Sequence, residues 1–583
     1  MTEIKTPILD TVNGPEDVKK LDLDQLTIMA EEMRQLILRK DSAVGGHVGP
    51  NLGDVELTIA FHDVFESPKD KIVWDVSHQS YAHKMLTGRK IGFMPGHYDE
   101  ISGYSNQHES KHDFFTVGHT STSIALAVGL AQARDLKHES GNVMAFIGDG
   151  ALSGGLAFEA LNNGGRMNSN LIVLVNDNGM SIDENQGSLY TNLAELRITE
   201  GKARNNIFKS FGFDYRYIAK GNDLATVIAA FKEVKDIDHP IVLHVHTQKG
   251  RGYQPAIDHK MAYHWRTPFD LATGAAKTPK TGEDYGDVIA DYLNHKTADA
   301  PLVAINAAIP GAFGLKAFEA QHPDRYFDVG IAEQFSITFT AALASQGIRP
   351  IVFHSSTFLQ RAYDQLVHDI AINDVPAVIV VRSGRISDGD RTHQGTFDID
   401  YLSTIPNLKY LAPATKEDVI TMLDWALTQK EHPVAIRIPE HGVTHGTAIA
   451  TDYSDSHYQV LEKGQKVAIL ALGGFLNLGQ KVQAQLQAQG ITATLINPGF
   501  ITDYDTETLT DLKADHTLVV TLEDGSLEGG FGEKIDRFYS ASAMKVLNFG
   551  AKKEFTDNEP LTEIYQRYHL TPELIVKDIL AQL

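Results

Sequence analysis

Two polar triplets, each placed directly after an apolar run, constrain the fold of this chain more than any other feature. Gly-Asp149-Gly follows residues 143–147, whose composition is that of a buried strand, and precedes the helix-like residues 151–161. Asn-Asp-Asn178 follows a second apolar run at 171–175. Strand, helix and strand in this order predict a parallel crossover unit that brings both triplets to one edge of a sheet.

Asp149 and Asn178 would each present an oxygen atom at this edge, beside a helix N-terminus. Oxygen ligands in such a place suit Mg²⁺ that holds a phosphate group. By itself a Gly-Asp-Gly triplet is more often a turn than a metal site. The paired asparagine favours the metal-site interpretation.

Length and composition exclude several classes of function. At roughly 100 to 200 residues per domain, 583 residues predict three or four domains. The chain has no cysteine, which excludes disulfides, thiolate metal sites and cysteine nucleophiles. A formal net charge of −23 disfavours nucleic acid and anionic membrane surfaces as partners, so any anionic substrate needs a local basic cluster.

The N-terminus and the apolar runs give an expectation for the location of the protein. The first residues lack the basic and apolar regions of a signal peptide. No stretch of about 18 apolar residues is present that could cross a membrane. We therefore expect a cytoplasmic protein with no membrane partner.

The first part of the chain holds a helix, a glycine-rich segment and two notable histidines. Asp24 is expected to cap a helix whose apolar positions run from Leu26 to Leu36. Residues 45–53 are rich in glycine and contain His47, and they fit a structural turn and a ligand-approaching loop equally well. His78 follows a short predicted strand.

Further along, residues 116–124 lead into a helix of small residues at 125–133. The hydroxyl groups at its start either cap this helix or bind an anion. Repeated alternation of strands, glycine turns and helices predicts parallel sheets. Residues 273–281 have the composition of a linker, and two more strand-rich units follow, with strands expected at 302–305, 351–353, 377–381, 467–471, 493–496 and 517–521.

A series of motifs runs through the chain in a fixed order: Gly-Gly-His47, Trp-Asp-Val-Ser-His78-Gln, Gly-His119-Thr-Ser-Thr-Ser, the Asp149 and Asn178 triplets, Ile-Ala-Glu333-Gln, Ser-Thr-Phe358-Leu-Gln-Arg361 and Thr-His393-Gln-Gly. In type and order these motifs resemble those of the 1-deoxy-D-xylulose-5-phosphate synthases, thiamine diphosphate (ThDP) enzymes of the transketolase superfamily. The resemblance covers nearly the whole chain.

The resemblance implies an α/β fold of three doubly wound domains with mostly parallel sheets. These would be an N-terminal diphosphate-binding domain at 1–275, a pyrimidine-binding domain at 282–445 and a C-terminal transketolase-like domain at 455–583. It also implies a homodimer, which is the commonest symmetric arrangement. The family's product would feed isoprene and thiamine biosynthesis.

By the same resemblance, the cofactors are ThDP and Mg²⁺, and the metal ligands are Asp149, Asn178 and the carbonyl of Met180. The residues that would bind ThDP are His78, Gly118, His119, Thr120, Ser121, Gly150, Ala151, Asn178, Ile182, Lys249, Glu333, Phe358 and Arg361. From sequence alone, Glu333 would be a glutamate that favours a helix start, and Phe358 and Ile182 would be core residues. The resemblance instead places Glu333 at the pyrimidine ring, Phe358 on its face and Ile182 beneath the bent cofactor.

Decarboxylation of pyruvate and transfer of the two-carbon unit to an aldehyde require proton donors and acceptors. Histidine has a suitable pKa, and the motif positions give His47, His78, His264 and His393 as catalytic candidates together with Glu333. Any single one of the 25 histidines is more often a surface or core residue than a catalyst. These four assignments therefore depend on motif context.

The sequence departs from the family pattern where the aldehyde acceptor would bind. Arg382 matches one of two arginines that bind the acceptor's phosphate, but Glu440 stands where the second belongs. A carboxylate there removes a charge-assisted bond and adds repulsion. Ser355 replaces a tyrosine, and Gly389 replaces an aspartate. Residues 180–220 are also shorter than in the typical synthase, whereas Arg385 and Arg391 flank the loop and could contact a phosphate instead.

We therefore expect pyruvate and an aldehyde such as D-glyceraldehyde 3-phosphate as substrates, with Arg382, Ser355, His393 and Glu440 at the substrate. Two alternatives stay open. One is a transketolase-type or acyloin-forming enzyme that acts on another aldehyde acceptor. Assays with ketose phosphates and with pyruvate as donors would distinguish it from a synthase. The other is a non-catalytic ThDP-binding protein, which intact Glu333, Asp149 and Asn178 disfavour.

Overall fold

The computed structural model describes residues 4–182, 184–296, 301–440 and 442–583. The chain forms two compact units. The first consists of Met1–Thr281 and Gly330–Ala332, and the second of Gly282–Val329 and Glu333–Leu583. In the described residues, no helix combines the length and the apolar character that crossing a bilayer requires.

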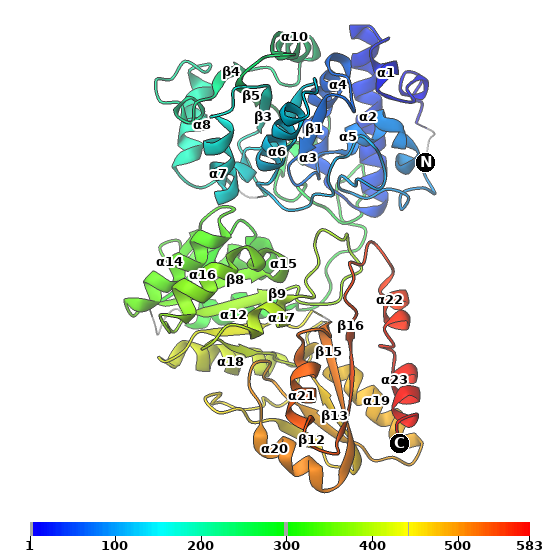
Figure 1. Cartoon of the computed structure of the whole chain (residues 1–583), viewed down its shortest axis with the longest axis vertical. Helices are drawn as coiled ribbons and strands as arrows, with labels where there is room; N and C mark the ends of the chain where they lie inside the picture. The colour runs from blue at the N-terminus through cyan, green and yellow to red at the C-terminus, as the bar shows by residue number, and fades with distance from the viewer. Residues whose placement is uncertain (1–3, 183, 297–300, 441) are drawn as a thin grey trace. The chain divides into compact units, whose positions relative to one another are not determined.

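The first unit is built on a five-stranded sheet with the order β1-β2-β3-β5-β4, in which all neighbouring strands are parallel (Figure 1). Its strands are β1 (Lys71–Trp74), β2 (Val143–Gly148), β3 (Leu171–Asp177), β4 (Asp214–Ile218) and β5 (Pro240–His246). The strands expected at 143–147 and 171–175 are confirmed as β2 and β3.

Helices cover both faces of this sheet, because alternate residues of each buried strand point to opposite sides. Ala145 of β2 packs in one apolar cluster with Ala127 and Leu161, whereas the adjacent Phe146 packs in another with Phe61 and Phe231. This is a doubly wound arrangement. Its helices are α1 (Pro15–Val18), α2 (Leu23–Val44), α3 (Val48–Gly53), α4 (Val55–Val64), α5 (Tyr81–Lys84), α6 (Ser123–Leu136), α7 (Gly155–Gly164), α8 (Ser188–Ile198), α9 (Ile207–Ser210), α10 (Leu224–Val234) and α11 (Gln254–Asp258).

Two local expectations for the first unit are wrong. Asp22, not Asp24, caps α2. It forms a capping box: its side chain accepts a hydrogen bond from the Gln25 backbone N–H, and the Gln25 side chain accepts one from the Asp22 backbone N–H. The segment expected to be a loop after His47 instead contains the short helix α3. Pro50 lies in the first turn of α3, where a missing N–H costs nothing.

The second unit contains two sheets (Figure 1). The six-stranded parallel sheet has the order β10-β11-β9-β8-β6-β7, and the five-stranded sheet has the order β12-β14-β13-β15-β16, in which only the β12–β14 pairing is antiparallel among the described strands. The strands are β6 (Leu302–Asn306), β7 (Tyr326–Asp328), β8 (Arg349–Ser355), β9 (Val378–Arg382), β10 (Lys409–Leu411), β11 (Val434–Arg437), β12 (Gln459–Glu462), β13 (Lys466–Ala471), β14 (Thr494–Asn497), β15 (His516–Ser526) and β16 (Lys545–Ala551).

One apolar core joins the two sheets of this unit, since Leu411 of β10 and Leu470 of β13 belong to the same buried cluster. The separate boundaries 282–445 and 455–583 therefore stay a prediction, as does the boundary of 1–275. The helices of this unit are α12 (Tyr285–Lys296), α13 (Leu315–Gln321), α14 (Glu333–Ser345), α15 (Ser356–Leu359), α16 (Tyr363–Gln365), α17 (Asp398–Ser403), α18 (Lys416–Thr428), α19 (Leu476–Ala488), α20 (Thr506–Asp511), α21 (Phe531–Tyr539), α22 (Leu561–Arg567) and α23 (Pro572–Leu580).

Candidate active site

In the first unit, the two polar triplets lie at neighbouring strand ends. Gly148 of β2 pairs in register with Asn176 of β3, and the backbone N–H of Asp149 donates to the Asn176 carbonyl at 3.2 Å. Parallel pairing therefore brings Asp149 and Asn178 to the same edge of the sheet. This is the arrangement that the sequence predicts.

The oxygen atoms at this edge fit a small hard cation. Asp149 is buried, and its Oδ2 accepts from the Asn185 side chain at 2.8 Å. The Asn178 Oδ1 atom is buried and has no hydrogen-bond partner among the described residues, so it remains available as a ligand. A carboxylate and an amide oxygen, with a backbone carbonyl such as the one predicted at Met180, are oxygen donors of the kind that Mg²⁺ prefers. Burial, followed by the nearby charge of Asp177, raises the pKa of Asp149, and a cation would offset this.

Asp177, which lies between the two asparagines, supports the turn that carries Asn178. Its Oδ1 accepts from the Gly179 N–H at 3.1 Å, and its Oδ2 contacts His244 Nε2 at 2.7 Å and the Arg197 guanidinium. His244 is fully buried in β5, and its other ring nitrogen contacts the Tyr215 hydroxyl at 2.9 Å. Sequence reasoning missed this network.

Three predicted histidines come together in the first unit. The ring centroids of His47 and His78 are 4.9 Å apart, those of His78 and His264 are 5.2 Å apart, and those of His47 and His264 are 5.8 Å apart. Asn51 holds the first two segments in place, because its Nδ2 donates to the carbonyls of both His47 and His78. The predicted catalytic cluster is thus formed by residues from three distant segments.

Lys249 joins this cluster to the turn after Asn178. Its Nζ donates to the Ser181 carbonyl at 2.6 Å and lies 3.1 Å from His264 Nδ1. Burial lowers the pKa of Lys249 to about 8, although the Asp149 carboxylate opposes this shift. Burial, followed by the charge of Lys249, holds the pKa of His264 well below its usual value, so its ring is neutral.

The predicted binding loop at Gly118, His119, Thr120 and Ser121 is anchored at its Ser121 end. The Ser121 N–H donates to Asp75 Oδ1 at 2.7 Å, and its hydroxyl donates to the Ala151 carbonyl at 2.7 Å. Asp75 directly follows β1 and also accepts from the Ser123 N–H, at 2.9 Å. Sequence reasoning missed this aspartate, although a polar residue directly after a buried strand is a usable signal.

Gly150 follows β2, and Ile182 lies in the segment after β3 that approaches it. A Cβ atom on Gly150 would lie 2.7 Å from the Ser181 side chain, so the close approach of the two segments requires glycine. Ile182 is half-buried in the turn after Met180. Their predicted roles toward ThDP stay predictions.

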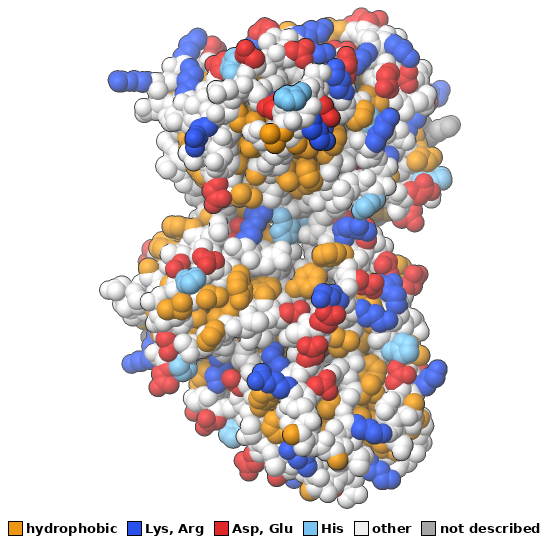
Figure 2. Space-filling view, viewed as in Figure 1, with side chains coloured by type: hydrophobic (Ala, Val, Ile, Leu, Met, Phe, Trp, Pro, Cys, Tyr) orange, Lys and Arg blue, Asp and Glu red, His pale blue; other side chains and the backbone are white. Residues whose placement is uncertain are grey.

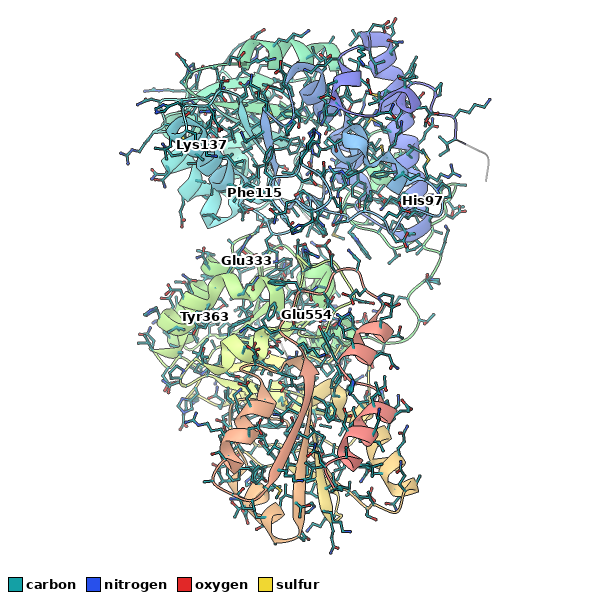
Figure 3. All side chains as sticks on the ribbon, turned by 45° about the vertical axis from the view of Figure 1, so that its right-hand side comes forward. His97, Phe115, Lys137, Glu333, Tyr363 and Glu554 are labelled. Atoms are coloured by element: carbon teal, nitrogen blue, oxygen red, sulfur yellow. The ribbon has the colours of Figure 1, made fainter. Side chains whose placement is uncertain are left out.

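In the second unit, Glu333, which is labelled in Figure 3, is the first residue of α14, and its side chain is buried. Its Oε2 lies 3.7 Å from Arg361 Nη1. Burial raises the pKa of Glu333, whereas Arg361 lowers it less strongly. A buried carboxyl group that retains its proton can donate a hydrogen bond to a ring nitrogen.

Phe358 and His393 also lie together. Their ring centroids are 5.8 Å apart with the planes nearly perpendicular, an edge-to-face contact. His393 Nδ1 is 3.0 Å from the Thr392 hydroxyl, and burial lowers the pKa of the imidazole. The second unit therefore presents an aromatic face with a histidine at its edge.

The predicted acceptor residues form an ion pair. Arg382 and Ser355 pair in register at the ends of β9 and β8, and Arg382 Nε is 3.0 Å from Glu440 Oε1. Glu440 Oε1 also accepts from the Ser383 N–H at 2.8 Å. The guanidinium thus binds a carboxylate of its own chain.

The arginines suggested as substitutes are also near acidic groups. Arg391 Nε lies 2.8 Å from Asp557 Oδ2, and Arg385 lies 3.8 Å from Asp388. Gly389 sits in this loop, where its carbonyl accepts from the Asn558 N–H. Because Arg391 already binds Asp557, it is a poor substitute for the second phosphate-binding arginine.

Comparison with known domains identifies the class. Residues 9–205 match the family described as 1-deoxy-D-xylulose-5-phosphate synthase, residues 279–444 match the transketolase pyrimidine-binding domain, and residues 456–575 match the transketolase C-terminal domain. With its parallel sheets and helices, the chain is a transketolase-type enzyme that depends on thiamine diphosphate.

Curated relatives then give the particular family. Proteins named 1-deoxy-D-xylulose-5-phosphate synthase from Syntrophomonas wolfei and Carboxydothermus hydrogenoformans are each 38% identical to this chain, over 98% and 99% of it and over 96% and 100% of their own lengths. The protein of that name from Clostridium beijerinckii is 37% identical over 98% of this chain and 99% of its own. The chain belongs to the 1-deoxy-D-xylulose-5-phosphate synthase family.

A transketolase structure from Campylobacter jejuni aligns with 96% of this chain and 100% of its own length, at 16% identity and a TM-score of 0.44. This likeness is too distant to bear on the family assignment.

Proposed function

We propose that this enzyme binds ThDP with Mg²⁺, decarboxylates pyruvate and joins the two-carbon unit to an aldehyde, with D-glyceraldehyde 3-phosphate as the acceptor that its relatives' name implies. The observation that carries the cofactor assignment is the Asn178 Oδ1 atom, which is buried without a partner among the described residues. Asp149 lies on the adjacent strand end, and the Met180 carbonyl completes the proposed metal ligands.

When bound, ThDP supplies a nucleophilic carbon that adds to the keto group of pyruvate and accepts the electron pair left when carbon dioxide departs. Glu333 would donate a hydrogen bond to the pyrimidine ring, because burial favours its protonated form. Phe358 would pack on that ring, and Lys249 together with the Ser121 loop would hold the diphosphate. The homodimer and the cytoplasmic location also remain proposals.

The histidines would move protons on the substrate. Burial and the charge of Lys249 keep His264 neutral, so it would accept a hydrogen bond from a substrate hydroxyl group, although its lowered pKa makes it a weaker base than an ordinary histidine. His47 and His78 adjoin it and would share this role. His393 lies beside Phe358 in the second unit and would bind the pyruvate carboxylate or the acceptor hydroxyl.

The direct test measures carbon dioxide release from pyruvate, and product formation with D-glyceraldehyde 3-phosphate, in the presence of ThDP and Mg²⁺. Asn178→Ala should abolish Mg²⁺-dependent ThDP binding, measured by calorimetry, and should leave the melting temperature of the apoprotein within a few degrees of wild type. Asn163→Ala on the exposed face of α7 is the matched control. Unchanged ThDP affinity in Asn178→Ala would refute the proposed metal site.

A second candidate function has an acceptor that carries no phosphate, and the ion pair between Arg382 and Glu440 favours it. Both side chains are mostly buried, with 17% and 12% of their surfaces exposed. A phosphate would have to displace the carboxylate before it could bind Arg382, and it would meet the repulsion of Glu440.

The two candidates predict different acceptor preferences. If the ion pair excludes phosphate, the wild-type kcat/KM for D-glyceraldehyde will equal or exceed that for its 3-phosphate, and Glu440→Gln will lower the KM for the phosphate by about tenfold. Glu431→Gln, at an exposed position before β11, serves as the control. If wild type strongly prefers D-glyceraldehyde 3-phosphate over D-glyceraldehyde and Glu440→Gln does not change this preference, the acceptor without a phosphate is ruled out.

A further inference from the structure

A cavity in the first unit lies at the carboxyl ends of β3, β4 and β5, next to the metal-ligand turn. It has a volume of about 540 Å³, within the range of about 300–1,000 Å³ that small-molecule sites occupy. Its wall includes Asn178, His246 and residues of the loops that follow β4 and β5. The carboxyl edge of a parallel sheet is where such folds bind ligands.

The charged side chains of this wall are mainly cationic. Lys220, Arg251 and Lys260 line the cavity, against the single carboxylate of Asp223 among its described residues. Lys220 is exposed and Lys260 is half-buried, and neither forms a salt bridge with any residue that the structure describes. Three cations gathered in one cavity contrast with the formal net charge of −23 of the whole chain.

The acidic groups near these cations are already engaged. Asp223 caps α10, since its Oδ1 accepts from the Thr226 N–H at 2.9 Å. Glu56 lies 3.5 Å from Arg251, but both of its carboxylate oxygens are bound by Arg34, at 2.5 and 2.6 Å. Although Asp223 interacts with Lys220 and Arg251, and Glu56 is shared between Arg251 and Arg34, cations outnumber carboxylates and the cavity retains an excess of positive charge.

The backbone of the cavity is held rigidly. The Gly221 N–H donates to the His246 carbonyl at 2.9 Å, and a Cβ atom on Gly221 would lie 2.5 Å from that oxygen. Asn222 Oδ1 accepts from the Gln248 N–H at 2.8 Å. The loops after β4 and β5 are thus joined at two points, and the cavity is formed before a ligand arrives.

We propose that this cavity binds a phosphate-bearing small molecule, with Lys220, Lys260 and Arg251 as its contacts. A dianionic phosphate matches the excess of cations, and lysine and arginine are the side chains that bind it best. The cavity adjoins the proposed metal site through Asn178, but Asp149, Lys249 and the histidine cluster are not among its described lining residues. The proposal goes beyond the proposed function, because it assigns a second ligand site that the synthase reaction does not require.

The test uses the enzyme saturated with ThDP and Mg²⁺, so that the proposed cofactor site is already filled. Calorimetric titration with inorganic phosphate and with glycerol 3-phosphate should give binding, and titration with glycerol should give none. The double variant Lys220→Gln/Lys260→Gln should bind both phosphates at least about tenfold more weakly. Its melting temperature should match wild type, because neither lysine forms a salt bridge with the described residues.

The matched control is Lys137→Gln/Lys209→Gln, which removes the same charge from two exposed positions of the same unit. Phosphate bound elsewhere on the enzyme persists in both double variants, so the difference between them reports this cavity. Equal phosphate affinity in the two variants, or no binding by wild type at millimolar phosphate, would overturn the proposal. Carbon dioxide release from pyruvate, measured in the same samples, tests the proposed function independently.

Discussion

The carboxylate of Asp177 shows how a residue can act on a proposed metal site without being a ligand. It binds His244, Arg197 and the N–H of Gly179, and so it fixes the turn on which Asn178 lies. Mutation of a group that orients a metal ligand typically lowers metal affinity by about 10- to 100-fold. If the proposed metal site is right, His244 is a positioning residue for it.

His244→Gln should weaken Mg²⁺-dependent ThDP binding by about tenfold, because Asp177 loses one of the contacts that fix its orientation. Calorimetry with ThDP at saturating Mg²⁺ measures the effect. His239→Gln replaces a half-buried histidine just before β5, and this variant should bind ThDP normally. A lower melting temperature with unchanged ThDP affinity would mean that the network serves stability alone.

Asp41 gives a prediction for the pH dependence of stability. Neither of its carboxylate oxygens has a hydrogen-bond partner among the described residues, and burial raises its pKa to about 7. The folded protein therefore holds a proton that the unfolded chain loses near pH 4. The stability that this proton contributes is present below about pH 4 and is lost as the pH rises to about 7.

Asp41→Asn should remove this pH dependence. In urea unfolding of the apoprotein, the variant should gain about 2 kcal/mol more relative to wild type at pH 8 than at pH 5. Asp24→Asn, at an exposed position of the same helix, should show the same small effect at both pH values. A pH-independent difference for Asp41→Asn would show that its carboxyl group ionises normally.

At the level of elements, the start of α7 packs closely against the Ser121 loop. A Cβ atom on Gly154 would lie 2.1 Å from Ser121 Oγ and 2.7 Å from its Cβ. Gly154→Ala should therefore displace the loop, weaken ThDP binding and lower stability by about 1–3 kcal/mol. Gly129→Ala in α6, where a Cβ would meet nothing within 4 Å, should preserve ThDP affinity and raise stability slightly.

How far the sequence predicts these elements depends on whether the signal is local. The apolar runs that became β2 and β3 are long and bounded by glycine and asparagine, so their strands and the edge that carries Asp149 and Asn178 were predictable. The capping box of α2 is visible in the sequence as Asp22 followed three residues later by Gln25, so the cap was predictable, although our prediction placed it at Asp24. Helix α3 was not predicted, because its glycines are typical of a turn or loop.

The rest of the site depends on contacts between distant segments. Asp177 meets His244 only because β3 pairs with β5, and Asp75 meets Ser121 only because β1 ends beside that loop. No periodicity or turn signal encodes such pairings. The ion pair of Arg382 with Glu440 could not be predicted from the sequence either. The sequence predicts that Glu440 repels a phosphate, but it does not predict that Glu440 binds Arg382.

At the scale of the whole molecule, the second unit exposes a group of neighbouring aromatic side chains. On α14, Phe335 is 56% exposed and stacks on Phe339, which in turn contacts the 37% exposed Phe327. Figure 2 shows apolar side chains gathered over α14 and α16. Exposed apolar patches of this kind mark interaction surfaces, and a second copy of the chain is the occupant that the proposed homodimer supplies.

The dimer proposal predicts that the wild-type enzyme has twice the chain mass of 64.1 kDa in light scattering. Phe335→Lys should shift the population toward 64.1 kDa at micromolar concentration, because a buried lysine without a partner opposes association. Leu136→Lys, at a 71% exposed leucine at the end of α6, controls for the charge change and should leave the mass unaltered. A wild-type mass of one chain would refute the homodimer. A dimer that Phe335→Lys leaves intact would place its interface away from α14.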